Sequence, residues 1–136
     1  MSGVESFLDT NVLLYLLSED GAKADRVEDL LTRSNVISVQ VLNEFAAVTT
    51  RKLALSVGEV REVLETIRIV CSVEPLTTAT HDTGLDLAER LGLSIYDAMI
   101  VASALQAGCR TLYTEDLQHH QLIGRQLRVV NPFADA

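Results

Sequence analysis

The chain has 136 residues, a length typical of one domain, and 48% of them are hydrophobic, which is enough for one core. The formal net charge of −8 argues against a protein that holds nucleic acid on a broad basic surface. This charge does not exclude an enzyme that cuts nucleic acid, because bound divalent cations would offset clustered carboxylates, and it favours a basic protein partner.

In the first half of the chain, strand-like apolar runs alternate with helical periodicity. Val4 to Leu8 and residues 35–38 have the short apolar pattern of buried strands. Apolar residues at helical spacing predict helices over residues 11–17 and 22–33, and Ser38 can cap a third helix that extends to about Leu53. Each predicted strand is therefore followed by at least one helix.

The second half continues this alternation. Ser56 and Glu59 fit a capping box at the start of a helix that extends to about Ile69. The remaining predicted elements are a strand at 70–73, a helix at 80–91 closed by Gly92, a helix at 94–107 closed by Gly108, a strand at 110–114 and a fifth strand at 127–130. Short apolar strands alternating with helices predict an α/β protein over residues 1–136, a three-layer α/β/α sandwich around a mostly parallel sheet of four or five strands.

The cysteines and the N-terminal segment indicate where the protein resides. Cys71 and Cys109 do not form a CxxC pattern, and we expect both to be buried and free. Such cysteines are typical of the reducing cytoplasm. The apolar run from Val12 to Leu17 is far shorter than the ~20 residues of a membrane span, and no signal peptide is recognisable. We therefore expect a cytoplasmic protein that does not associate with membranes.

Four carboxylates interrupt apolar segments or directly follow apolar strands: Asp9, Glu44, Asp97 and Asp116. An ionised carboxylate that faces a core is costly unless it is paired or binds a metal, and few Lys or Arg lie near these four in the sequence. Sites in parallel sheets collect beyond the carboxyl ends of the strands, which all four side chains can reach. The sequence therefore predicts one shared site with a divalent cation as the missing partner.

Helix capping is the structural alternative for two of these acids. Asp9 precedes a helix and can cap it, although Thr10 and Asn11 can also do so, which would leave Asp9 spare. Ser94 and Asp97 match the Ser-x-x-Asp variant of a capping box. Capping alone would therefore account for an acid at either position.

The other two acids have different structural alternatives. Glu44 lies in the middle of a helix and can be at the border of a two-sided helix rather than in a site. Asp116 follows a strand, where solvated acids are common, and its neighbour Glu115 is barely distinguishable from it by sequence. Thr114, at the end of the same strand, can orient a carboxylate or simply form a turn.

Carboxylate oxygens alone select hard cations, chiefly Mg²⁺ or Mn²⁺, and no Cys/His spacing indicates zinc. Such ions polarise a phosphoryl oxygen and lower the pKa of bound water, which is the chemistry of phosphodiester hydrolysis. Without metal, clustered carboxylates repel one another, so at least one should hold its proton more tightly than usual.

Two other classes of small parallel α/β protein fit poorly. A response-regulator receiver needs a Lys after its fifth strand, but no Lys follows Lys52. A haloacid-dehalogenase-like phosphatase needs Asp-x-Asp after its first strand, where this chain has Asp9-Thr10-Asn11.

Four motifs occur in order along nearly the whole chain: Leu8-Asp9-Thr10-Asn11, Asn43-Glu44-Phe45, Tyr96-Asp97-Ala98-Met99-Ile100 and Leu112-Tyr113-Thr114-Glu115-Asp116. In this order and in these strand and helix contexts, they resemble the PIN-domain nuclease family. Within that family, the chain is most similar to the small, single-domain VapC-like toxins of type II toxin–antitoxin systems.

The resemblance implies an endoribonuclease that depends on Mg²⁺ or Mn²⁺. The residues it maps to the site are the catalytic and metal-binding acids Asp9, Glu44, Asp97 and Asp116 and the supporting polar residues Asn11 and Thr114. It also implies a homodimer, an RNA substrate and an antitoxin that covers the acidic site, with DNA contacted only through the antitoxin. The alternative is a catalytically inactive PIN-fold binding module that acts through a partner protein.

Overall fold

The computed structural model describes residues 5–134, in which six strands form one sheet. The strands are β1 (Ser6–Leu8), β2 (Asn35–Ser38), β3 (Cys71–Glu74), β4 (Thr111–Tyr113), β5 (Leu122–Ile123) and β6 (Leu127–Val130). Their order across the sheet is β3-β2-β1-β4-β6-β5, and every pair is parallel except β5 with β6. The predicted mostly parallel sheet is confirmed; Val4, the predicted start of the first strand, lies outside the described residues.

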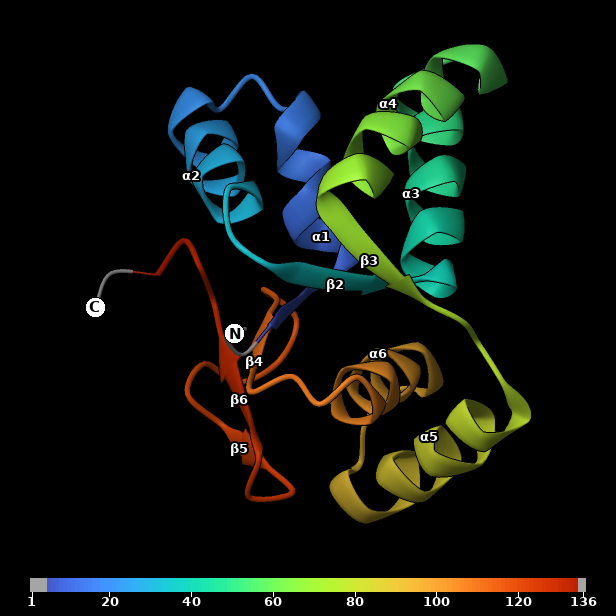
Figure 1. The fold of residues 1–136 in the computed structure, drawn as a ribbon, viewed down its shortest axis with the longest axis vertical. Coiled ribbons are helices and arrows are strands. Elements are labelled where there is room, and N and C mark those ends of the chain that lie inside the picture. Colours follow the sequence, from blue (N-terminus) through green and yellow to red (C-terminus); the bar gives the residue numbers. More distant parts are fainter. Residues whose placement is uncertain (1–4, 135–136) are drawn as a thin grey trace.

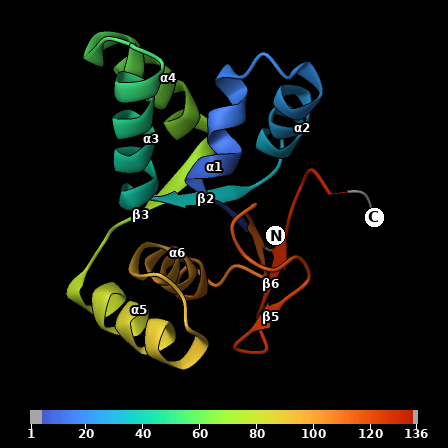
Figure 2. The same cartoon turned by 180° about the vertical axis from the view of Figure 1, so that it is seen from behind.

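Helices cover both sides of this sheet, which confirms the three-layer prediction. The helices are α1 (Thr10–Leu13), the 3-10 helix η1 (Leu14–Leu17), α2 (Gly21–Leu31), α3 (Val39–Lys52), α4 (Val57–Val70), α5 (Thr78–Leu91) and α6 (Ile95–Gln106). In Figures 1 and 2, α1 to α4 lie on one side of β2 and β3, and α5 and α6 lie side by side on the other. Among residues 5–134, none of the helices has the length and apolar character needed to cross a bilayer.

Local capping chemistry sets several helix boundaries. Ser56 and Glu59 form the predicted capping box at the start of α4. The helix predicted to begin at Thr80 begins two residues earlier, because Thr77 and Thr80 form a reciprocal box there. Gly92 ends α5 in the left-handed conformation, with φ of 68°, as predicted for a C-terminal glycine.

The hairpin of β5 and β6 was not predicted. Ile123 pairs with Leu127, so residues 124–126 form the loop, and its first two residues, Gly124 and Arg125, both have positive φ, as a type I′ turn requires. The backbone N–H of Gln126 donates to the carbonyl of Ile123 and closes the turn at 3.2 Å. This antiparallel edge strand raises the strand count to six among the described residues, one more than the upper predicted number.

The core surrounds α6, whose seven consecutive residues 98–104 are all buried. Three of these are alanines, whose small side chains let the helix lie closely between the sheet and α5. Cys71 and Cys109 are buried and free, as predicted. Because α6 is enclosed in this way, its first turn, which carries Asp97, has a fixed position.

The end of the central strands determines where the site forms. Leu8 at the end of β1 pairs in register with Tyr113 at the end of β4. Asp9 and Thr114 therefore follow two neighbouring parallel strands at the same edge of the sheet. The backbone N–H of Asp9 donates to the Tyr113 carbonyl at 3.0 Å, which fixes this edge.

Candidate metal centre

Asp9 is buried, with only 6% of its surface exposed, and both of its carboxylate oxygens accept hydrogen bonds. Oδ1 accepts from the backbone N–H of Thr10 at 2.7 Å, so Asp9 itself is the N-cap of α1. Of the three capping residues that the sequence allowed, Asp9 is the one that caps, because α1 begins directly after it. Oδ2 accepts from the hydroxyl of Thr114 at 2.8 Å, a contact that capping does not require.

Thr114 connects the residues around Asp9. Its hydroxyl donates to Asp9 and accepts from Asn11 Nδ2 at 3.2 Å and from the backbone N–H of Asp116 at 3.1 Å. A hydroxyl has one donor and two acceptor positions, so the buried Thr114 is fully satisfied. Asn11 Oδ1 also accepts from the backbone N–H of Glu115 at 3.3 Å. The two polar residues singled out from the sequence thus orient Asp9 and the loop that carries Asp116.

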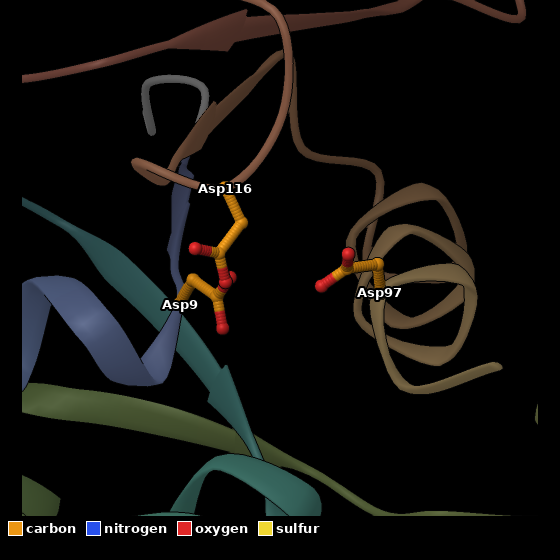
Figure 3. Close-up of side chains that lie close together, drawn as sticks. All are labelled: Asp9, Asp97 and Asp116. Carbon is orange, nitrogen blue, oxygen red and sulfur yellow. The ribbon is translucent and has the colours of Figure 1, made fainter. Parts of the chain in front are cut away.

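Three of the four predicted acids converge. Asp9, Asp97 and Asp116 each offer one carboxylate oxygen, and these oxygens lie within 4.8 Å of one another. Figure 3 shows Asp97 extending from α6 toward Asp9 and Asp116, which come from the opposite side of the site. The Ser94 hydroxyl accepts from the backbone N–H of Asp97 at 3.2 Å, so Ser94 caps the helix while the Asp97 carboxylate faces the other two acids.

Glu44 lies at the wall of this site rather than in the group of three. It is half-buried on α3 and lines the same hollow, of about 180 Å³, as Asp9, Asp97 and Asp116. Its Oε1 accepts a hydrogen bond from the Thr10 hydroxyl at 3.1 Å. The sequence placed all four acids in one site, and the structure separates them into three convergent carboxylates and one neighbour.

The structure also separates Glu115 from Asp116, which the sequence did not. The Glu115 carboxylate accepts a hydrogen bond from the Tyr15 hydroxyl at 2.8 Å and pairs with Lys23 at 3.6 Å. Asp116, one residue later, joins Asp9 and Asp97. Tyr15 and Lys23 were not among the predicted site residues, because no spacing pattern links them to Glu115.

Burial and mutual repulsion perturb the acids of this site. Burial raises the pKa of Asp9 to about 7, although hydrogen bonds from Thr114 and Thr10 oppose the rise and the nearby charges of Asp116 and Glu44 add to it. Burial likewise raises the pKa of Asp97, a hydrogen bond from Ser94 opposes that rise, and Asp116 adds to it. Between residues 5 and 134, neither Lys nor Arg forms an ion pair with the four acids.

This donor set fits a hard divalent cation. Carboxylate oxygens from three separate segments face one another, and the three carboxyl groups have no basic partner in the described part of the chain. Such all-oxygen sites suit Mg²⁺ or Mn²⁺.

Comparison with known protein families identifies the family of this chain. Residues 6–123 match the model of the PIN domain. The chain belongs to the PIN-domain family. Comparison with curated proteins finds no significant match.

Solved structures with the same fold extend over most of this PIN domain. A toxin–antitoxin complex from Klebsiella pneumoniae is 18% identical, with a TM-score of 0.72 over 95% of this chain and 98% of that chain. VapC20 from Mycobacterium tuberculosis, described as a sarcin–ricin loop cleaving toxin, is 21% identical, with a TM-score of 0.67 over 82% and 90%. DNA-bound VapBC from Salmonella typhimurium is 21% identical, with a TM-score of 0.67 over 93% and 97%. At these identities the likeness establishes the fold.

Proposed function

We propose that this PIN domain is a metal-dependent endoribonuclease that hydrolyses RNA phosphodiester bonds as the toxin of a toxin–antitoxin pair. The observation that supports this most strongly is the convergence of Asp9, Asp97 and Asp116 with no basic partner among the described residues. Asp9 is the buried member of the three, and a purely structural buried acid would be expected to gain an arginine or lysine partner, since unpaired buried charge is costly.

Asp9, Asp97 and Asp116 would hold Mg²⁺ or Mn²⁺. When bound, such an ion polarises a phosphoryl oxygen and lowers the pKa of a water molecule. The chain's own residues prepare the site: Thr114 fixes the Asp9 carboxylate, and the enclosed helix α6 fixes the backbone of Asp97.

Glu44 is suited to a proton-transfer or outer-ligand role. Thr10 holds its Oε1, while Oε2 accepts no hydrogen bond from residues 5–134. This second oxygen, on the wall of the hollow, can accept a proton from an attacking water or hold that water in place.

Both the site chemistry and the relatives favour an RNA substrate and an antitoxin partner. One structural relative is described as cleaving the sarcin–ricin loop, and others were solved as toxin–antitoxin complexes. The net charge of −8 suits a basic antitoxin segment that covers the acids. We further propose a homodimer in the cytoplasm that contacts DNA only through the antitoxin.

The test is cleavage of defined RNA substrates by purified protein, with Mg²⁺ or Mn²⁺ and with a chelator, alongside Asp97→Asn. We expect cleavage that requires metal and is lost in the variant, because the variant removes one charged ligand and keeps the side-chain shape. Cleavage that persists equally in Asp97→Asn would contradict the assignment. The result that would instead favour an inactive binding module is a protein that binds an antitoxin while neither the wild type nor Asp97→Asn cleaves tRNA, ribosomal RNA or messenger RNA.

A further inference from the structure

Glu115 and three residues around it form a group that engages its carboxylate apart from the three clustered acids. We call it the Glu115 clasp; its members are Tyr15, Lys23, Glu115 and Phe133. The Tyr15 hydroxyl donates to Glu115 Oε1 at 2.8 Å, and Lys23 Nζ donates to the same hydroxyl at 3.2 Å and pairs with Glu115 Oε2 at 3.6 Å. Both Glu115 oxygens are therefore engaged on the side facing η1 and α2.

Aromatic packing holds the ammonium in place. Lys23 Nζ lies 4.6 Å from the centre of the Tyr15 ring and 5.2 Å from that of Phe133. The two rings pack edge to face with centres 4.7 Å apart. Arg26 Nε donates to the Pro132 carbonyl at 3.1 Å, which ties the C-terminal segment bearing Phe133 to α2. The clasp thus joins three distant parts of the sequence.

The clasp is connected to the acid site through the backbone of Glu115. That backbone N–H donates to Asn11 Oδ1, and Asn11 Nδ2 donates to the Thr114 hydroxyl. Thr114 in turn donates to Asp9 and accepts from the backbone N–H of Asp116. A continuous set of hydrogen bonds therefore runs from Tyr15 to two of the three convergent acids.

We infer that the Glu115 clasp is a positioning device that selects Asp116, and not its neighbour Glu115, as the metal-facing acid of this loop. This inference rests on the proposed metal site. Tyr15 and Lys23 occupy both Glu115 oxygens, so the longer carboxylate is not available to the cation and the short loop after β4 presents Asp116. Residues that orient metal ligands in this way affect metal affinity without touching the ion.

The test is calorimetric titration of Mn²⁺ at 25 °C into the full-length folded protein, with Tyr15→Phe, Glu115→Ala and the double variant. Tyr15→Phe keeps the ring that packs on Phe133 and Lys23 and removes only the hydroxyl. We expect it to weaken Mn²⁺ binding by about 10-fold. We expect no further loss when Tyr15→Phe is added to Glu115→Ala, because the hydroxyl acts through that carboxylate.

Tyr113→Phe is the matched control for Tyr15→Phe. It removes a tyrosine hydroxyl that makes no side-chain hydrogen bond within residues 5–134. This variant should not weaken Mn²⁺ binding. A general structural role for Tyr15 would lower the melting temperature but leave the affinity of the folded protein at 25 °C unchanged.

The possible results separate the two proposals. Equal Mn²⁺ affinity in wild type and Tyr15→Phe would overturn the positioning role while leaving the metal site intact. The positioning role would also be overturned if Tyr15→Phe weakened Mn²⁺ binding by the same factor in the Glu115→Ala protein as in the wild type. Absence of Mn²⁺ binding by the wild type would contradict the metal site itself, and the positioning role with it.

Discussion

Two groups of charged residues in this chain show opposite ways of accommodating carboxylates. On the exposed surface of α2, Asp29 pairs with Arg26 at 3.1 Å and with Arg33 at 3.0 Å. At the carboxyl edge of the sheet, Asp9, Asp97 and Asp116 face one another with no arginine or lysine from residues 5–134. The carboxylate of the first group has cationic partners within the protein, whereas the second group has an excess of negative charge in a partly buried hollow.

The difference lies in solvation and position rather than in residue type. Asp29 is 56% exposed, so water screens its charge and the two arginines add little to stability. Asp9 is 6% exposed, and its pKa rises to about 7 because burial disfavours the charged form. Bringing the acids of the second group together therefore destabilises the metal-free folded protein, as is expected of a site organised for a ligand.

The largest expected contrast between the two groups is in catalysis. Asp116→Asn should slow RNA cleavage at saturating Mn²⁺ by about 100-fold or more, which corresponds to ~2.7 kcal/mol in activation free energy. Asp29→Asn should leave the rate unchanged, because Asp29 lies on the surface of α2 outside the site. Initial rates of cleavage of one defined RNA measure both effects. A similar loss of rate in Asp116→Asn and Asp29→Asn would contradict the functional difference between the two groups.

A second contrast concerns the stability of the metal-free protein. Asp9→Asn should raise the free energy of unfolding at pH 8 by roughly 1–3 kcal/mol, because it removes a buried charge at the cost of one hydrogen bond. Urea unfolding in the presence of a chelator measures this change. If Asp9→Asn proved less stable than the wild type, the Asp9 carboxylate would be favourably accommodated without metal.

The same residue predicts a pH dependence. The pKa of Asp9 is about 7 in the folded protein and near 3.8 when unfolded, so the folded state binds more protons between these values. The contribution of Asp9 to stability is therefore full below pH 4 and is lost as pH rises through 7. The stability gained by Asp9→Asn should be larger at pH 8 than at pH 5, and an equal gain at both would contradict the raised pKa.

The smallest expected effect is on the free energy of unfolding when Asp29, which pairs with two arginines, is changed. Asp29→Asn should change the free energy of unfolding by less than about 1 kcal/mol, since exposed ion pairs contribute little. High salt should reduce even this difference. Urea unfolding in low and high salt tests both statements, and a change of several kcal/mol would show that α2 depends on this pair.

The fold class and the convergence of Asp9, Asp97 and Asp116 could be predicted because they depend on short-range patterns. Apolar runs and helical spacing identify the strands and helices, and the carboxyl ends of parallel strands meet at one edge. Asp9 and Asp116 each follow such a strand directly or after a short loop, and Asp97 begins a helix with a clear cap. Their positions therefore follow from local sequence and one topological rule.

Other features depend on contacts that no local pattern contains. The two-residue strand β5 is too short for an alternating pattern and forms only because β6 pairs with it. The Tyr15 hydroxyl meets Glu115 across 100 positions in the sequence, so the difference between Glu115 and Asp116 appears only once the chain is folded. Glu44 was predicted to lie with the other three acids, and it does line the same hollow. Its separation from the three convergent carboxylates is determined by the path of α3, which the sequence does not reveal.

The most direct test of the central claim is a titration of Mn²⁺ into metal-free protein while the melting temperature is followed, with Asp97→Asn and Asp29→Asn in parallel. A ligand that binds only the folded state raises its stability with concentration. We predict a saturable rise for the wild type and for Asp29→Asn, and little or none for Asp97→Asn. No rise in the wild type, or an equal rise in Asp97→Asn, would contradict a metal centre formed by Asp9, Asp97 and Asp116.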